Sequence, residues 1–115
     1  MKLIGSKTEK DIEAELLALT LSALASPKGS YLKRLLSELN VSSQKVIVLS
    51  RFPDESCDVY LLLIENRLIG QVEIDSSDLE NPIIETFTIP EYKNGLSKIQ
   101  QLKLAVAKVL LSSET

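Results

Sequence analysis

The sequence has no histidine, and it has a single cysteine, Cys57. Without an imidazole there is no Ser-His or Cys-His nucleophile pair, no histidine base and no histidine metal ligand. One thiolate cannot build a zinc site, and Cys57 cannot form a disulfide within the chain, which favours a reducing compartment. Carboxylates, lysines, tyrosines and hydroxyls are the side chains left for catalysis.

The sequence also lacks an apolar run of the ~18 residues that a membrane-spanning helix needs. One apolar stretch, residues 16–25, ends in Ala-Leu-Ala, which is similar to a signal-peptidase site. A signal peptide would carry positive charge ahead of that stretch, whereas this chain has Glu9, Asp11, Glu13 and Glu15 there. We therefore expect a cytoplasmic protein that does not bind a membrane.

The composition is that of one ordinary folded domain. The chain has 115 residues, of which 44% are hydrophobic and 25% charged, and this argues against disorder. A chain of this length buries roughly 65% of its unfolded surface, enough for a core without disulfides or metals. We expect a single domain over residues 1–115.

The charges are segregated along the chain. Residues 54–91 contain ten acidic side chains and one basic one, a net charge of −9. Each flanking segment, residues 1–53 and 92–115, has a net charge of +3. The net charge of −3 for the whole chain therefore hides a strongly acidic central segment.

Helices are predicted at both ends of the chain. Two overlapping capping-box patterns at residues 6–11 predict a first helix that ends near residue 25, because Pro27 disfavours helical geometry at Ser26. Ser26 and Pro27 then suit the N-cap and first position of a second helix, which ends before Asn40. Ser97 suits the N-cap of a final helix, whose predicted inner stripe is Ile99, Leu102, Val106, Val109 and Leu110.

The acidic central segment carries the strand patterns. Residues 46–49 are continuously apolar, which predicts a strand buried on both faces, and residues 52–56 should end it. Residues 58–64 and 68–75 form a predicted hairpin around a turn at 65–67, and residues 83–89 form a fourth strand. A short helical turn is expected at 91–95. The order predicts an α+β fold, ααββββα, with a mostly antiparallel four-stranded sheet.

The length of the hairpin loop decides which side chains share a face. With a two-residue loop, one face would carry Asp58, Tyr60, Leu62, Gln71, Glu73 and Asp75. A three-residue loop would reverse the parity and separate them. Such acids facing one another are destabilising, so we consider three interpretations: a solvated face, a binding surface for a basic protein with Tyr60 and Leu62 as apolar anchors, and a magnesium site.

The magnesium interpretation has a specific form. A helix with Glu13, a strand with Asp58 and a strand with Glu73-Ile74-Asp75 resemble the αβββα core of the PD-(D/E)xK nucleases. That resemblance implies carboxylates that hold Mg²⁺ and a lysine two residues after the second acid, but this chain has Asp75 there. A segment with a charge of −9 would also repel a phosphate backbone. We expect no nucleic-acid partner, and at most a degenerate nuclease.

The ends of the chain carry a second resemblance. Residues 1–9 (MKLIGSKTE), 92–99 (YKNGLSKI) and 102–107 (LKLAVA) resemble segments of small bacterial proteins that include immunity proteins of contact-dependent growth inhibition and related polymorphic toxin systems. The resemblance implies stoichiometric binding of a cognate toxin domain, often a basic nuclease, by an acidic surface.

Our hypothesis from the sequence is an immunity-type binding protein without catalysis, cofactor or metal. Its partner would be a cationic toxin, bound through Asp58, Gln71, Glu73 and Asp75 with the two apolar anchors. A third alternative is a homo-oligomeric structural domain that pairs through the edge at residues 83–89, which a concentration-dependent mass in solution would reveal.

Overall fold

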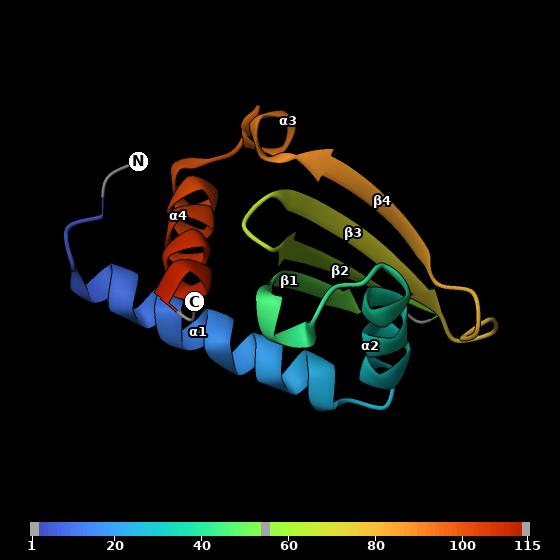
Figure 1. Ribbon diagram of the computed structural model, residues 1–115. Coiled ribbons are helices and arrows are strands. Elements are labelled where there is room, and N and C mark those ends of the chain that lie inside the picture. Colours follow the sequence, from blue (N-terminus) through green and yellow to red (C-terminus); the bar gives the residue numbers. More distant parts are fainter. Residues whose placement is uncertain (1–2, 54–55, 114–115) are drawn as a thin grey trace.

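The computed structural model describes residues 3–53 and 56–113 and has the predicted α+β class. Two helices precede a four-stranded sheet, and two helices follow it (Figure 1). The elements are α1 (Lys7–Ala25), α2 (Gly29–Glu38), the 3₁₀ turn η1 (Ser43–Lys45), β1 (Val46–Pro53), β2 (Cys57–Ile64), β3 (Leu68–Asp75), β4 (Ile83–Thr88), α3 (Ile89–Lys93) and α4 (Lys98–Ser113). The order differs from the prediction by the short helix α3, which replaces the turn expected at 91–95.

The sheet is a meander in the order β1-β2-β3-β4, and all its pairs are antiparallel. β1 continues to Pro53, so the prediction that residues 52–56 end the strand is wrong for its first two residues. The pairing shifts by one residue between Val48 and Ser50. This bulge lets the strand bend and continue after its buried first half, Val46 to Leu49.

One face of the sheet is covered by α2 and the C-terminal half of α1, which lie beneath it in Figure 1. The core on this face is built around Tyr60 and Leu62, both fully buried, with Leu32 and Leu36 of α2 packed in the same cluster. Gly70 lies opposite Leu62, and a Cβ there would be 2.8 Å from the Ile64 side chain. A side chain larger than that of glycine would therefore contact Ile64 at this position.

The opposite face has a core at the hairpin end of the strands only. There Ile47, Leu63 and Ile69 pack with Ile12 and Leu16 of α1 and with the buried residues of α4. In Figure 1, α4 stands over this end of the sheet, and the far end of the same face has no helix above it. The helices α1 and α2 therefore cover most of one side of the sheet but leave Thr86 of β4 exposed, and the other side is covered over about half its length.

Helix starts follow the predicted capping residues. Glu9 N–H donates to Ser6 Oγ (3.2 Å), so Ser6 is the N-cap of α1 as predicted. The Glu9 carboxylate accepts from the backbone N–H groups of Ile4 and Gly5. Gln100 N–H donates to Ser97 Oγ at the start of α4. The helix α2 begins at Gly29 rather than after Ser26, although Ser26 Oγ still accepts from the Gly29 N–H.

The predicted inner stripe of the final helix is correct in part. Val106 is buried, and Leu102 and Leu110 pack against the core, but Ile99 and Val109 are exposed. The other buried residues of α4 are Leu104, Ala107 and Leu111. The cause is that apolar residues surround most of α4, so their spacing could not select the side that meets the sheet. In the described parts of the chain, no helix is long and apolar enough to cross a membrane.

Candidate functional site

The β2–β3 hairpin has the three-residue loop. Glu65 and Asn66 take positive φ values of 52° and 59°, and Ile64 pairs with Leu68 across the loop. Asp58 therefore pairs with Ile74, and Tyr60 pairs with Val72. The predicted shared face is wrong, because this register puts Asp58, Tyr60 and Leu62 on one side of the sheet and Gln71, Glu73 and Asp75 on the other.

Asp58, Tyr60 and Leu62 lie on the face of the sheet that α1 and α2 cover. Tyr60 and Leu62 are fully buried, and Asp58 is 4% exposed. The Asp58 carboxylate accepts a hydrogen bond from Arg51 Nη2 at 2.8 Å and one from Lys28 Nζ at 3.3 Å. The Tyr60 hydroxyl donates to the same carboxylate at 3.3 Å. Asp58 is thus the anion of a buried ion-pair network, not a surface group.

The electrostatics of this network keep Asp58 ionised. Burial by itself would raise the pKa of Asp58, but the hydrogen bonds from Arg51 and Lys28 outweigh burial and hold that pKa below its ordinary value. Burial raises the pKa of Tyr60, which stays a neutral donor. The Arg51 guanidinium also lies 5.7 Å from the centre of the Tyr60 ring, close enough for a cation–π contact. We conclude that the network ties the start of α2 to β1 and β2.

Gln71, Glu73 and Asp75 lie on the opposite face of the sheet, in the half that no helix covers. Two rows of paired residues cross all four strands there: Phe52–Val59–Glu73–Ile83, and Ser50–Leu61–Gln71–Glu85. Partners in a row point to the same side of a sheet. We call this surface the open face and define it by the eight residues Ser50, Phe52, Val59, Leu61, Gln71, Glu73, Ile83 and Glu85. Asp75, paired with Cys57, lies at its border.

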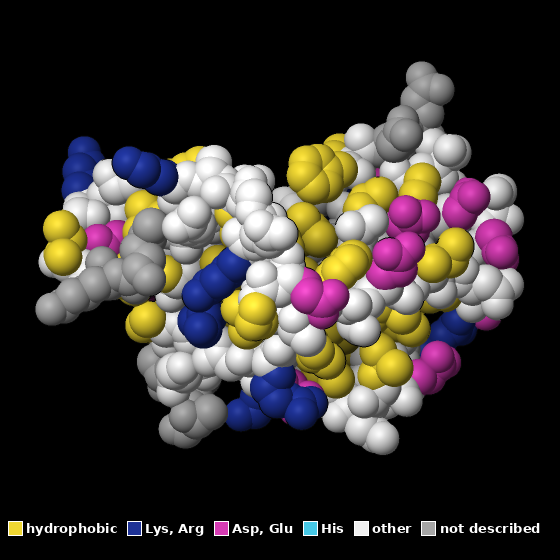
Figure 2. Space-filling view, turned by 90° about the horizontal axis from the view of Figure 1, so that it is seen from above, with side chains coloured by type: hydrophobic (Ala, Val, Ile, Leu, Met, Phe, Trp, Pro, Cys, Tyr) yellow, Lys and Arg dark blue, Asp and Glu magenta, His cyan; other side chains and the backbone are white. Residues whose placement is uncertain are grey.

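The open face combines exposed apolar groups with carboxylates. Phe52 is 58% exposed and Ile83 is 60% exposed, and they stand at the two ends of the row that contains Glu73. Glu85 is exposed in the neighbouring row. Figure 2 shows hydrophobic and acidic side chains interspersed over the sheet half of this side of the molecule, and most of the visible Lys and Arg side chains lie outside that half. The surface is therefore apolar and negative at once.

Sequence reasoning missed Phe52, Val59, Leu61, Ile83 and Glu85 as members of this surface. A signal was present in β3, where Gly70, Val72 and Ile74 alternate with Gln71, Glu73 and Asp75. The apolar set of β3 had to share a face with the apolar core residues of β2. A two-residue loop would have placed Asp58 opposite an acid of β3. The resulting repulsion also favoured the three-residue loop.

The structure separates the residues of the magnesium interpretation. Asp58 and Glu73 lie on opposite faces of the sheet, and Glu13 is exposed on α1. Among the described residues, no group of three His, Cys, Asp or Glu side chains is placed to hold a metal ion. The geometry that would support a PD-(D/E)xK site is thus not formed by these three carboxylates.

The two edges of the sheet differ. At the β1 edge, the Val48 N–H donates to Thr20 Oγ1 of α1 at 2.9 Å, so the helix satisfies part of that edge. β4 is the outermost strand on the other side, and Ile83, Glu85 and Thr86 are exposed along it. Pairing of two copies through this edge stays a prediction.

Comparison of the chain with protein-family models, with curated proteins and with solved structures finds no match. The fold and the surface together define a small α+β domain with a half-covered antiparallel sheet.

Proposed function

We propose that this protein is a non-catalytic binding module that takes up a basic protein in a 1:1 complex through its open face. The observation that carries the proposal is the row Phe52–Val59–Glu73–Ile83, in which two exposed apolar side chains flank a carboxylate. The residues predicted for this role therefore change: Gln71, Glu73 and Asp75 remain, and Phe52 and Ile83 replace Tyr60 and Leu62 as anchors.

The apolar members of the open face supply the driving force for association. Protein interfaces typically have a desolvated centre with aromatic or aliphatic anchors and a polar rim. Phe52 and Ile83 are large side chains that the fold leaves mostly exposed, and Val59 and Leu61 are half-buried between them. An exposed apolar patch bordered by polar groups is typical of an interaction site.

The carboxylates determine the kind of partner. Glu73, Glu85 and Asp75 place three negative charges on or beside the apolar row, and no residue of the open face is basic. Such a surface attracts a cationic protein and disfavours acidic ones. A face that served only to keep the sheet soluble would need the acids but not the exposed Phe52 and Ile83 in the same row.

The partner in this proposal is a toxin domain with a basic surface, and the protein is its immunity protein. The proposal agrees with the resemblance of the chain ends to immunity proteins and with the acidic charge of residues 54–91. It places the complex in the cytoplasm and requires neither a cofactor nor a metal ion from this chain.

The test is a pull-down from the source lysate at low salt with three forms of the protein. The wild type should retain one basic protein in 1:1 ratio and release it in a salt step. The double variant Glu73→Lys/Glu85→Lys should retain at least about tenfold less, since like charges now face the partner. The control Glu13→Lys/Glu15→Lys makes the same change in charge at exposed sites of α1 and should behave as wild type.

Two results would contradict the proposal. One is that no stoichiometric basic protein is retained by the wild type. The other is that the open-face double variant retains the partner as well as the control does.

A further inference from the structure

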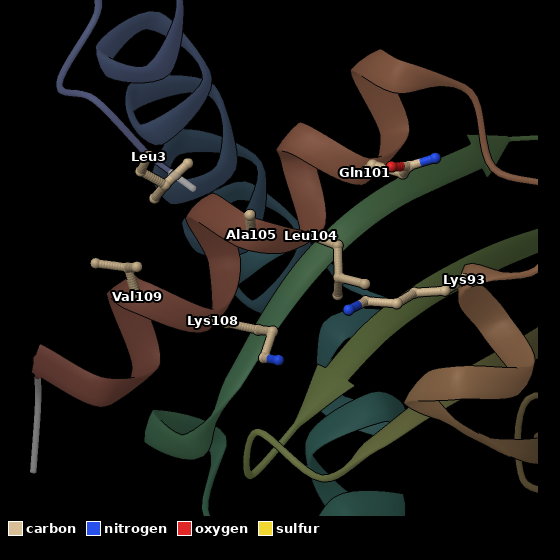
Figure 3. A pocket seen from close by; sticks show the side chains of 7 residues that line it. All are labelled: Leu3, Lys93, Gln101, Leu104, Ala105, Lys108 and Val109. Carbon is tan, nitrogen blue, oxygen red and sulfur yellow. The ribbon is translucent and has the colours of Figure 1, made fainter. Parts of the chain in front are cut away.

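A cavity of about 470 Å³ lies beside α4 and is lined also by Leu3 and by the end of α3. Two lysines from different elements line it, Lys93 at the end of α3 and Lys108 on α4. In Figure 3 the ammonium ends of both side chains turn toward the same space beside Leu104. Within residues 3–53 and 56–113, neither ammonium group forms an ion pair.

The remaining lining is mostly apolar. Leu104, Ala105 and Val109 form one stripe of α4 along the cavity, and Leu3 closes its other side (Figure 3). The position of Leu3 depends on Glu9 at the start of α1, because the Glu9 carboxylate accepts hydrogen bonds from the backbone N–H groups of the two residues that follow Leu3. The cavity therefore has a cationic side and an apolar wall.

Gln101 supplies the one neutral polar side chain of the lining. Its amide nitrogen already donates to the Leu96 carbonyl at 3.1 Å. The two ammonium groups are therefore the main donors that the cavity offers to a ligand.

We propose that this cavity binds a small amphiphilic anion, with a carboxylate or phosphate-monoester head between Lys93 and Lys108 and a short apolar chain against Leu104 and Val109. The volume falls in the range of about 300–1,000 Å³ that is typical of small-molecule sites, which are mostly apolar with a few placed polar groups. The site shares no residue with the open face and does not depend on the function proposed for it.

Charge decides the class of ligand. Two ammonium groups that face one space repel each other, and an anion between them removes that repulsion and gains charge-assisted hydrogen bonds. A cation or a neutral polar molecule gains neither. Lys93 is exposed and Lys108 is half-buried, so both ammonium groups are accessible from solvent. What distinguishes them from exposed Lys98 is that they converge beside the apolar wall (Figure 3), whereas Lys98 does not line the cavity.

The test is an NMR titration of the full chain with octanoate and with octyl phosphate below their micelle concentrations. We expect saturable shifts of the Ala105 and Val109 signals with at least one of the two probes. The probe that binds more tightly identifies the head group. Acetate, which lacks the apolar chain, and octylammonium, which reverses the charge, should bind at least about tenfold more weakly, as expected when one of two recognition elements is lost.

The variants Lys93→Gln and Lys108→Gln remove one charge each and keep a long polar side chain. Each should weaken octanoate binding by about tenfold or more, the usual scale for losing a charge-assisted hydrogen bond. Lys98→Gln is the matched control, because it makes the same change in charge on α4 at an exposed site outside the cavity, and it should leave the affinity unchanged. Thermal melts of all three show whether each variant is folded.

Val109→Asp gives an independent check on the apolar wall. It replaces an exposed side chain with an acid and should abolish binding without unfolding the protein. The proposal is overturned if neither anion binds, if octylammonium binds as tightly as octanoate, or if folded Lys93→Gln and Lys108→Gln variants keep the wild-type affinity.

Discussion

The structure gives Asp58 a different role from the one that the sequence predicted. As a residue of the acidic segment it looked like part of a binding surface, yet it is the buried partner of Lys28 and Arg51. Lys28 comes from the start of α2, far from Asp58 in the sequence, and Arg51 comes from the neighbouring strand β1. Leaving a buried carboxylate without its cationic partners costs free energy. The ion pairs of Asp58 therefore serve the stability of the fold.

We expect Asp58→Asn to lower the free energy of unfolding by about 1–3 kcal/mol at pH 7, since hydrogen bonds to a charged group are lost. The figure stays below that of fully buried pairs because Lys28 and Arg51 are partly exposed and regain water. The folded-state pKa of Asp58 is depressed, so its contribution is complete above the ordinary aspartate pKa and is lost as the pH falls below about 4.

Urea denaturation of wild type and variant at pH 7 and at pH 3 measures this effect. The difference between them should be full at pH 7 and smaller at pH 3. Asp11→Asn, at an exposed site on α1, is the control and should stay within about 0.5 kcal/mol of wild type. A difference that does not change with pH would mean that Asp58 stabilises the fold by packing and not by its charge.

At the scale of elements, the sequence predicted what depends on local chemistry. The N-caps Ser6 and Ser97 were both predicted correctly. Each follows from a few neighbouring residues. The inner stripe of α4 was predicted only in part, because Ile99 and Val109 are as apolar as the buried Val106 and only the sheet selects between them.

The joint between α1 and α2 depends on Gly29. A Cβ at this position would lie directly against the carbonyl oxygens of Ala23 and Leu24 at the end of α1. These are backbone atoms, so they cannot move aside as a flexible side chain could. We expect Gly29→Ala to lower the free energy of unfolding by about 2–3 kcal/mol, toward the upper end of the usual cost of overpacking.

Denaturant unfolding of Gly29→Ala and of Ser37→Ala tests the joint. Ser37 is exposed on the same helix, and alanine there should change stability by no more than about 0.5 kcal/mol. If Gly29→Ala changed the free energy of unfolding no more than Ser37→Ala does, α1 and α2 could move apart without loss of stability. The close approach at Gly29 would then not stabilise the joint.

At the scale of the whole molecule, the charge segregation of the sequence becomes a division of the fold. Residues 56–91 of the acidic segment form β2, β3, β4, their connections and the start of α3. The two flanking segments, each with a net positive charge, form the three longer helices and β1. Composition alone was enough to predict a negative sheet. The members of the open face were not predictable in the same way, because they depend on the length of the loop after Ile64. A loop shorter by one residue would move every side chain of β3 to the other face of the sheet.

The half-covered sheet leads to a last prediction, which compares two isoleucines on the same face. Ile69 is fully buried beneath α4, whereas Ile83 is 60% exposed in the open half. Ile69→Ala should lower the free energy of unfolding by about 2–5 kcal/mol, as in other cores. Ile83→Ala should lower it by no more than about 0.5 kcal/mol, as at other surface sites.

The two variants measured side by side decide what the open face is for. If Ile83→Ala leaves stability intact but weakens retention of the basic partner, the exposed row serves binding, since nothing in the fold requires an isoleucine there. If Ile83→Ala instead costs as much as Ile69→Ala, the far half of this face is part of the core. In that case the acids around it only solvate a closed surface, and the binding proposal loses its anchors.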